Sequence, residues 1–283
     1  MKLRTRDELL FLALAIPSLV GILGFFLVPF LYSFYLAMID NPVARNFVWF
    51  QNFTATFNNT AFRLAMRNTL IFMGISVPLN MILPLIIALL LRKTPRKELF
   101  AMFFLLPLVV PSGSVVHFWQ SMFGINGALN GLLFRAAPVN WLTTDWALVI
   151  ILVIFIWKNA GFNIVLYQAG LNMIPKEYYE CAAIEGAGRW TQFWRVTFIY
   201  LMPTYFMVLL MSILATFRSF REIYLLSGAH PSPNIYMLQH FMNNMFASLN
   251  YQRLAPAAYI LALGIIAVVV ITMFVQRRLA NYD

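Results

Sequence analysis

Six long apolar runs constrain the fold of this chain more than any other feature of its sequence. A transmembrane helix needs about 20 mostly apolar residues, and only helices or closed barrels satisfy the backbone in lipid. Barrel strands are short segments of alternating polarity, which these runs are not. The sequence therefore predicts an all-α, polytopic membrane protein with six transmembrane helices. The spans cover approximately residues 9–39, 69–91, 99–123, 146–171, 198–226 and 254–275.

The composition supports a membrane protein and excludes several soluble classes. Apolar residues make up 61% of the 283 residues and charged residues only 11%, whereas soluble domains keep roughly half apolar and a quarter charged. The single cysteine, Cys181, excludes an internal disulfide and a cysteine metal cluster. Nucleic-acid-binding proteins can share the net charge of +10, but here the basic residues mostly flank apolar runs, which indicates membrane topology.

The distribution of Lys and Arg among the loops predicts the orientation, because cytoplasmic loops are enriched in these residues. Twelve of them lie in the two termini and in the links between spans two and three and between spans four and five. The alternate loops hold five. We therefore expect both termini in the cytoplasm. The twelve are Lys2, Arg4, Arg6, Arg92, Lys93, Arg96, Lys97, Lys176, Arg189, Arg195, Arg277 and Arg278; the five are Arg45, Arg63, Arg67, Arg135 and Arg253.

The cytoplasmic segment 175–190, between spans four and five, has the pattern of a helix, a sharp turn and the start of a second helix. Pro175 suits the first position of a helix, and Glu180 complements the positive end of its dipole. Gly186 and Gly188 permit a sharp turn. Such an elbow offers a surface to another protein, although a simple connector has the same pattern.

The motifs in and around this elbow are shared with a known family. Glu180-Cys181-Ala182 is followed after three residues by Gly186. This motif resembles the "EAA" loop of permease subunits of binding-protein-dependent ABC importers, with a cysteine in place of the usual first alanine. Further motifs resemble the carbohydrate branch, of the maltose and glycerol-phosphate type, along nearly the whole chain. They are Asn68-Thr69-Leu70, Leu106-Pro107, Pro111-Ser112, Phe123-Gly124, Gly127-Ala128-Leu129-Asn130 and Ile174-Pro175.

The resemblance implies the type I ABC importer permease fold, with residues 1–283 forming one transmembrane domain in a bacterial or archaeal cytoplasmic membrane. It also implies a second, related permease as a heterodimer partner, two ATPase subunits, an extracytoplasmic solute-binding protein and a carbohydrate substrate, expected to be an oligosaccharide. The chain lacks a Gly-x-x-x-x-Gly-Lys-Ser/Thr loop, so we expect ATP and Mg²⁺ on the ATPase subunits. The implied ATPase-coupling residues are Glu180, Cys181, Ala182, Gly186 and Ala187.

Polar and aromatic side chains within the spans are candidates for the sugar pathway, because sugar hydroxyls need replacement hydrogen bonds when they leave water. Three lie on one stripe of span five and three on one face of span four. These positions align with sugar-contacting positions of the maltose-type permease. The alternative is that small polar residues join neighbouring helices, as is common in bilayers. The candidates are Ser112, Phe155, Asn159, Phe162, Ser212, Thr216 and Ser219.

Ionisable residues at membrane depth form a second set, because such residues usually face a cavity or pair with each other. Arg218 and Glu222 are four residues apart and could pair, which would leave Lys158 and Arg221 unpaired. The competing hypothesis is that Lys158 and Arg221 favour an acidic sugar. Both are included in the predicted pathway.

Two other functions fit a polytopic membrane protein less well. An ion-coupled secondary transporter would use intramembrane acids as relays, yet only Glu222 lies at depth, and no inverted repeat is evident. A membrane-embedded enzyme would need a metal cluster or a nucleophile with its base, and the sequence shows neither. We therefore predict a transport subunit that is not itself an enzyme.

Overall fold

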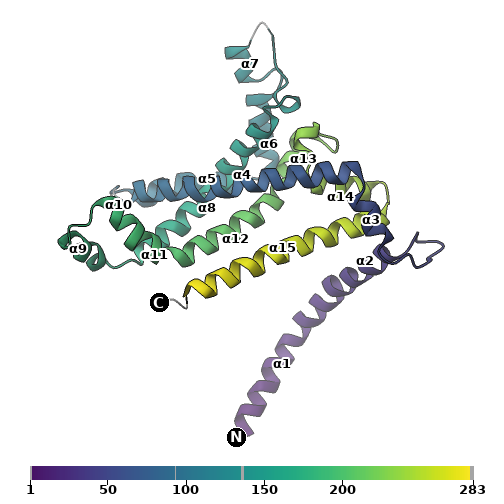
Figure 1. Cartoon of the computed structure of the whole chain (residues 1–283), viewed down its shortest axis with the longest axis horizontal. Helices are drawn as coiled ribbons and strands as arrows, with labels where there is room; N and C mark the ends of the chain where they lie inside the picture. Colours follow the sequence, from purple (N-terminus) through teal and green to yellow (C-terminus); the bar gives the residue numbers. More distant parts are fainter. Residues whose placement is uncertain (1, 93, 135–136, 281–283) are drawn as a thin grey trace. The chain divides into compact units, whose positions relative to one another are not determined.

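The computed structural model describes residues 2–92, 94–134 and 137–280 (Figure 1). Within these ranges the regular elements are helices, and the β-pairing is the isolated bridge between Ile39 and Phe47. The predicted all-α fold is therefore confirmed. Lys93 and Arg135, used above to predict the orientation, lie outside the described residues.

The described residues contain four helices that are long and apolar enough to cross a membrane. Two bent helix pairs raise the number to six if each pair is one span. Each of the six predicted spans therefore has a counterpart, although the second helix begins at Thr60 rather than at residue 69. The four helices are Ala13–Met38, α4 (Thr60–Leu91), α8 (Ala147–Asn172) and Tyr251–Arg278; the pairs are Glu98–Val109 with Ser112–Leu133, and Arg189–Tyr200 with Met202–Ser227.

Prolines account for two of the irregularities in the spans. Pro29 cannot donate a backbone hydrogen bond, and the turn that precedes it, Leu23–Leu27, widens into a π-helix. Pro111 disfavours a helical conformation at Val110, which is extended. As a result α5 (Lys97–Val109) ends there, and the chain bends by 96° before α6 (Ser112–Phe123).

The chain divides into two compact units. The first consists of Met1–Arg63 and Met242–Gly264, and it includes α1 (Lys2–Ile22), α2 (Val28–Met38) and α3 (Gln51–Phe57). Within it, the ring of Tyr259 packs 4.7 Å from that of Phe30. The second unit consists of Leu64–Phe241 and Ile265–Asp283, and it holds all the candidate site residues.

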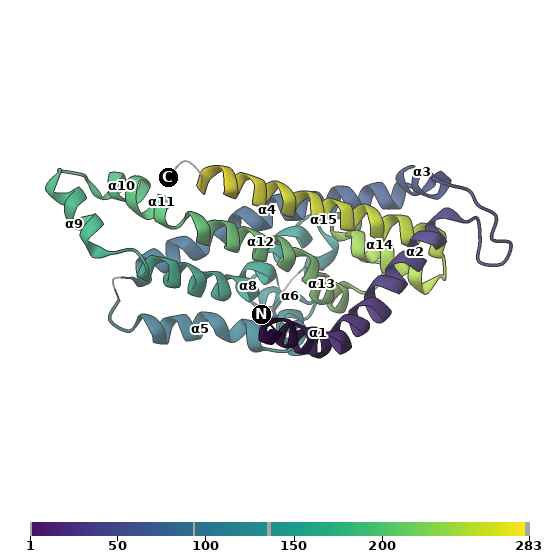
Figure 2. The ribbon, with the colours of Figure 1, turned by 90° about the horizontal axis from the view of Figure 1, so that it is seen from below.

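In the second unit, α8 packs alongside α5 and α12 (Met202–Arg218) (Figure 2). The approach to α5 is close at Gly161, where a Cβ atom would stand 1.9 Å from the carbonyl oxygen of Phe104. Tyr167 and Leu201 are among the fully buried side chains of the core beside α12. The remaining helices are α7 (Ala128–Leu133), α9 (Lys176–Ile184), α10 (Arg189–Gln192), α11 (Phe198–Tyr200), α13 (Phe220–Ser227), α14 (Leu238–Ala247) and α15 (Tyr251–Ala280).

Candidate functional site

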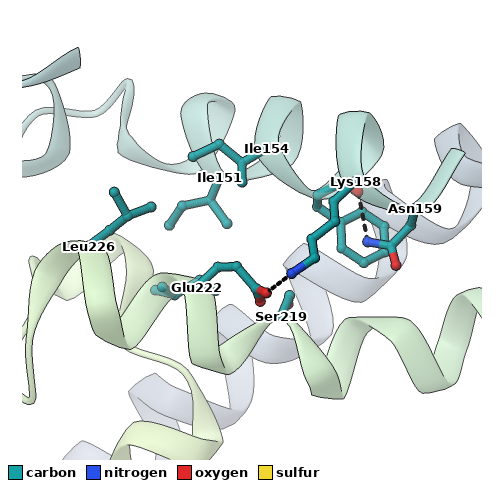
Figure 3. Close-up of a pocket in the computed structure, with 9 residues that line it drawn as sticks. Ile151, Ile154, Lys158, Asn159, Ser219, Glu222 and Leu226 are labelled. Atoms are coloured by element: carbon teal, nitrogen blue, oxygen red, sulfur yellow. Dashed lines mark hydrogen bonds and ion pairs between the residues drawn. The ribbon is translucent and has the colours of Figure 1, made fainter. Parts of the chain in front are cut away.

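An ion pair lies between α8 and α13, at the depth of the apolar spans (Figure 3). Lys158 Nζ donates to the carboxylate of Glu222 and to Ser112 Oγ, the latter at 3.0 Å. Ser112 Oγ donates to Glu222 Oε1 at 2.7 Å. The side chains of the pair are only 15% and 9% exposed. These three residues, called the polar triad below, thus connect α6, α8 and α13.

The triad corrects the pairing expected from the sequence. Glu222 on α13 pairs with Lys158 on α8. The predicted pair of Glu222 with Arg218 is therefore wrong, and Lys158 is not left unpaired. The physical reason is burial: Glu222 is buried and faces α8, whereas Arg218 is exposed. Arg221, the other cation assigned to the pathway, is also exposed and does not line the cavity beside the triad.

That cavity brings together several of the predicted pathway residues. Phe155, Lys158, Asn159 and Ser219 line it, together with Glu222 and four aliphatic side chains that the sequence did not single out. Its volume is about 10 Å³, roughly the room for one water molecule. A sugar ring is far larger, so the cavity is closed to a carbohydrate in this conformation.

Other predicted pathway residues lie elsewhere. Ser212 is fully buried, and its hydroxyl accepts hydrogen bonds from Asn80 and Asn163, so in this conformation it joins helices, as the alternative had it. Thr216 is buried and donates to a carbonyl of its own helix. Phe162 is 37% exposed and does not line the cavity. Sequence reasoning missed both asparagines, although an amide inside an apolar span is itself a signal of interhelical bonding.

The elbow has the predicted helix–turn–helix form. Helix α9 ends in a left-handed turn at Gly186, where φ is +79°. The Gly186 N–H donates to the carbonyl of Ala183 at 3.0 Å, and the Ala187 N–H donates to that of Ala182 at 2.9 Å. This pair of bonds is the Schellman motif, which favours glycine at the left-handed position. Helix α10 then begins at Arg189, as expected.

One side of the elbow is fixed to the membrane helices and the other is exposed. Tyr179 packs against the buried core, its hydroxyl lies 2.9 Å from Thr197 Oγ1, and the guanidinium of Arg92 lies 4.6 Å from its ring centroid. Glu180 and Cys181, the next residues on α9, are exposed. Of the coupling residues predicted from the motif, Glu180, Cys181 and Gly186 are therefore exposed, whereas Ala182 and Ala187 are half-buried and Ala182 packs against the core.

Comparison with known proteins assigns the chain to a family. Residues 53–281 match the family described as the binding-protein-dependent transport system inner membrane component. The chain belongs to this family. It is therefore a multi-pass inner-membrane subunit of a transport system, and its role is transport rather than catalysis.

Individual relatives agree with this assignment. The lactose transport system permease protein LacF of Rhizobium radiobacter is 30% identical over 216 residues, which cover 74% of this chain and 72% of the relative. The sn-glycerol-3-phosphate transport system permease protein UgpA of Rhizobium meliloti (strain 1021) is 28% identical over 275 residues, 94% of each chain.

A solved structure shares the fold. A chain of a bacterial ABC transporter involved in the import of the acidic polysaccharide alginate superposes with a TM-score of 0.84, over 98% of both chains, at 23% identity. The predicted ABC importer permease fold is thereby confirmed.

Proposed function

We propose that this chain forms half of the translocation pathway of an ATP-driven carbohydrate importer. The elbow carries the proposal, because it exposes Glu180, Cys181 and Gly186 of the coupling motif and has the turn that the motif requires. The partners are a second, related permease, two ATPase subunits that bind ATP and Mg²⁺, and an extracytoplasmic solute-binding protein. In this assembly both termini and the elbow face the cytoplasm, as the basic loops predict.

The proposed substrate is an oligosaccharide. The relative named for lactose, a disaccharide, supports this substrate class. The hypothesis of an acidic sugar loses part of its basis, because the charge of Lys158 is compensated by Glu222. It is still supported by Arg221, by the relative named for the anionic compound sn-glycerol-3-phosphate and by the likeness to a transporter involved in the import of the acidic polysaccharide alginate. An uptake competition decides it: neutral sugars that match or exceed acidic ones would exclude an acidic substrate.

The role of the elbow can be tested with two variants of Gly186. A Cβ atom there meets no neighbour within this chain, so a substitution affects the fold of the elbow only through the positive φ. Gly186→Val should strain the turn and reduce uptake by the assembled transporter, whereas Gly186→Asn should be tolerated, since asparagine adopts this conformation readily. Glu180→Ala should uncouple ATP hydrolysis from uptake, because its carboxylate is assigned a contact with a basic group of the ATPase. Normal substrate-stimulated uptake in both Gly186→Val and Glu180→Ala would refute the coupling role.

Cys181 provides a direct test of orientation and partner, since it is exposed and is the single cysteine of the chain. A membrane-impermeant maleimide should label it in inside-out vesicles stripped of peripheral proteins, and bound ATPase subunits should protect it. Labelling from the outside would contradict the proposed orientation. Co-purification of an ATPase would separate an ABC importer from an ion-coupled transporter, which needs none.

A further inference from the structure

A proline inside α4 leaves one backbone carbonyl of span two without its helical partner. In an α-helix, the N–H of each residue donates to the carbonyl four residues earlier. Pro84 lies inside α4 and has no N–H, so the carbonyl of Asn80 loses its intrahelical hydrogen bond. Asn80 is 1% exposed, so water does not reach that carbonyl readily. An unpaired carbonyl at this depth is costly.

The side chain of Asn163, on α8, supplies the missing donor. Its Nδ2 lies 2.8 Å from the carbonyl oxygen of Asn80. The same amide nitrogen lies 3.0 Å from Ser212 Oγ on α12, which in turn accepts from Asn80 Nδ2 at 3.1 Å. All three residues are buried, none more than 2% exposed. The two amide hydrogens of Asn163 are thus donated to two different spans, spans two and five.

We propose that Asn163 is a positioning residue that replaces the hydrogen bond removed by Pro84 and thereby fixes spans two, four and five to one another. The three bonds between Asn80, Asn163 and Ser212 are called the amide joint below. In this joint one donor is missing, the N–H that Pro84 lacks, and one donor, Asn163 Nδ2, replaces it.

The joint lies in line with the residues that face the small cavity. Asn159 and Phe155 are one and two helical turns from Asn163 on the same stripe of α8. Ser219, at the C-terminal end of α12, also lines the cavity and is about two turns from Ser212. The amide joint therefore fixes how the stripe of α8 that carries Asn159 lies against the stripe of α12 that carries Ser212. Its bearing on transport rests on the proposed function, whereas its existence does not.

A double-mutant cycle with Pro84 tests the joint on the full-length chain in lipid nanodiscs, followed by thermal unfolding. Asn163→Ala should lower the unfolding midpoint by several degrees, because it leaves a buried carbonyl unpaired. In a Pro84→Ala background the restored N–H can serve that carbonyl, so the same substitution should lower the midpoint clearly less. Pro84→Leu provides a second background if Pro84→Ala folds poorly.

Ser212→Ala is the matched control, because Ser212 does not contact the carbonyl that Pro84 leaves free. Its effect should be the same in both backgrounds. An equal loss for Asn163→Ala with Pro84 and without it would overturn the proposal, as would rescue of Ser212→Ala by Pro84→Ala. This cycle requires neither substrate nor ATPase, so its failure is distinguishable from failure of the elbow variants, which test the proposed function.

Discussion

The contact of α8 with α5 at Gly161 yields the sharpest prediction about stability. Gly161→Ala would place a Cβ atom 1.9 Å from the carbonyl oxygen and 2.4 Å from the carbonyl carbon of Phe104. Both atoms belong to the backbone of α5, so no side chain can turn away. An ordinary contact begins near 3.4 Å, which means that the two helices must separate by about 1.5 Å.

The energetic cost follows from two opposing effects. Overpacking of a tight contact costs 1–3 kcal/mol, and a clash between two backbones belongs near the upper value, about 3 kcal/mol. Alanine is favoured over glycine within a helix by about 1 kcal/mol, which offsets part of that cost. We therefore expect Gly161→Ala to destabilise the protein by about 2 kcal/mol.

Gly74 in α4 provides the control, because a Cβ atom there meets nothing within 4 Å. Gly74→Ala should be neutral or stabilise the protein by up to about 1 kcal/mol. Thermal unfolding in nanodiscs, followed by tryptophan fluorescence, should show a lower midpoint for Gly161→Ala and an unchanged or higher midpoint for Gly74→Ala. If Gly161→Ala were as stable as Gly74→Ala, the close approach of α5 and α8 would be refuted.

Two further predictions concern buried ionisable groups. Lys158→Met leaves the carboxylate of Glu222 buried without its cation and should lower the free energy of unfolding by about 3–5 kcal/mol. The double variant Lys158→Met with Glu222→Met should recover most of this loss. Equal melting points for the single and the double variant would contradict the pairing. Burial lowers the pKa of His240 to about 4. The contribution of the neutral ring to stability is therefore fully present above about pH 6.5, the pKa of histidine in the unfolded chain. It decreases as the pH falls towards 4, because the unfolded chain then binds a proton that the folded protein does not. Melting curves of His240→Gln should show a smaller decrease between pH 7 and 5 than those of the unchanged protein.

The features that the sequence predicted well are local ones. The spans follow from runs of apolar residues, and each can be recognised without its neighbours. The elbow follows from a few consecutive residues, since a glycine at 186 and the start of a helix near Arg189 depend on backbone preferences alone. Local preference and final structure agree here because the elbow is largely exposed and few tertiary contacts compete with it.

The features that were missed depend on how distant helices face each other. Arg218 is a reasonable partner for Glu222 by spacing alone, but the register of α13 against α8 gives the carboxylate to Lys158, 64 residues away. Ser212 shares a stripe with Thr216, yet the packing of α4 against that stripe turns its hydroxyl into an interhelical acceptor. Periodicity identifies a face of a helix, and only the tertiary structure decides what covers it.

The polar triad has a mechanical consequence. Ser112 is the first residue of α6, directly after the 96° bend, and Glu222 lies in α13, near the end of the helical segment Met202–Ser227. Lys158 therefore joins the segment that follows this bend to the end of span five through side-chain bonds. Two of the three bonds in the triad involve Lys158 Nζ, so loss of this one charge on α8 would leave only the bond between Ser112 and Glu222 to connect spans three and five at this point.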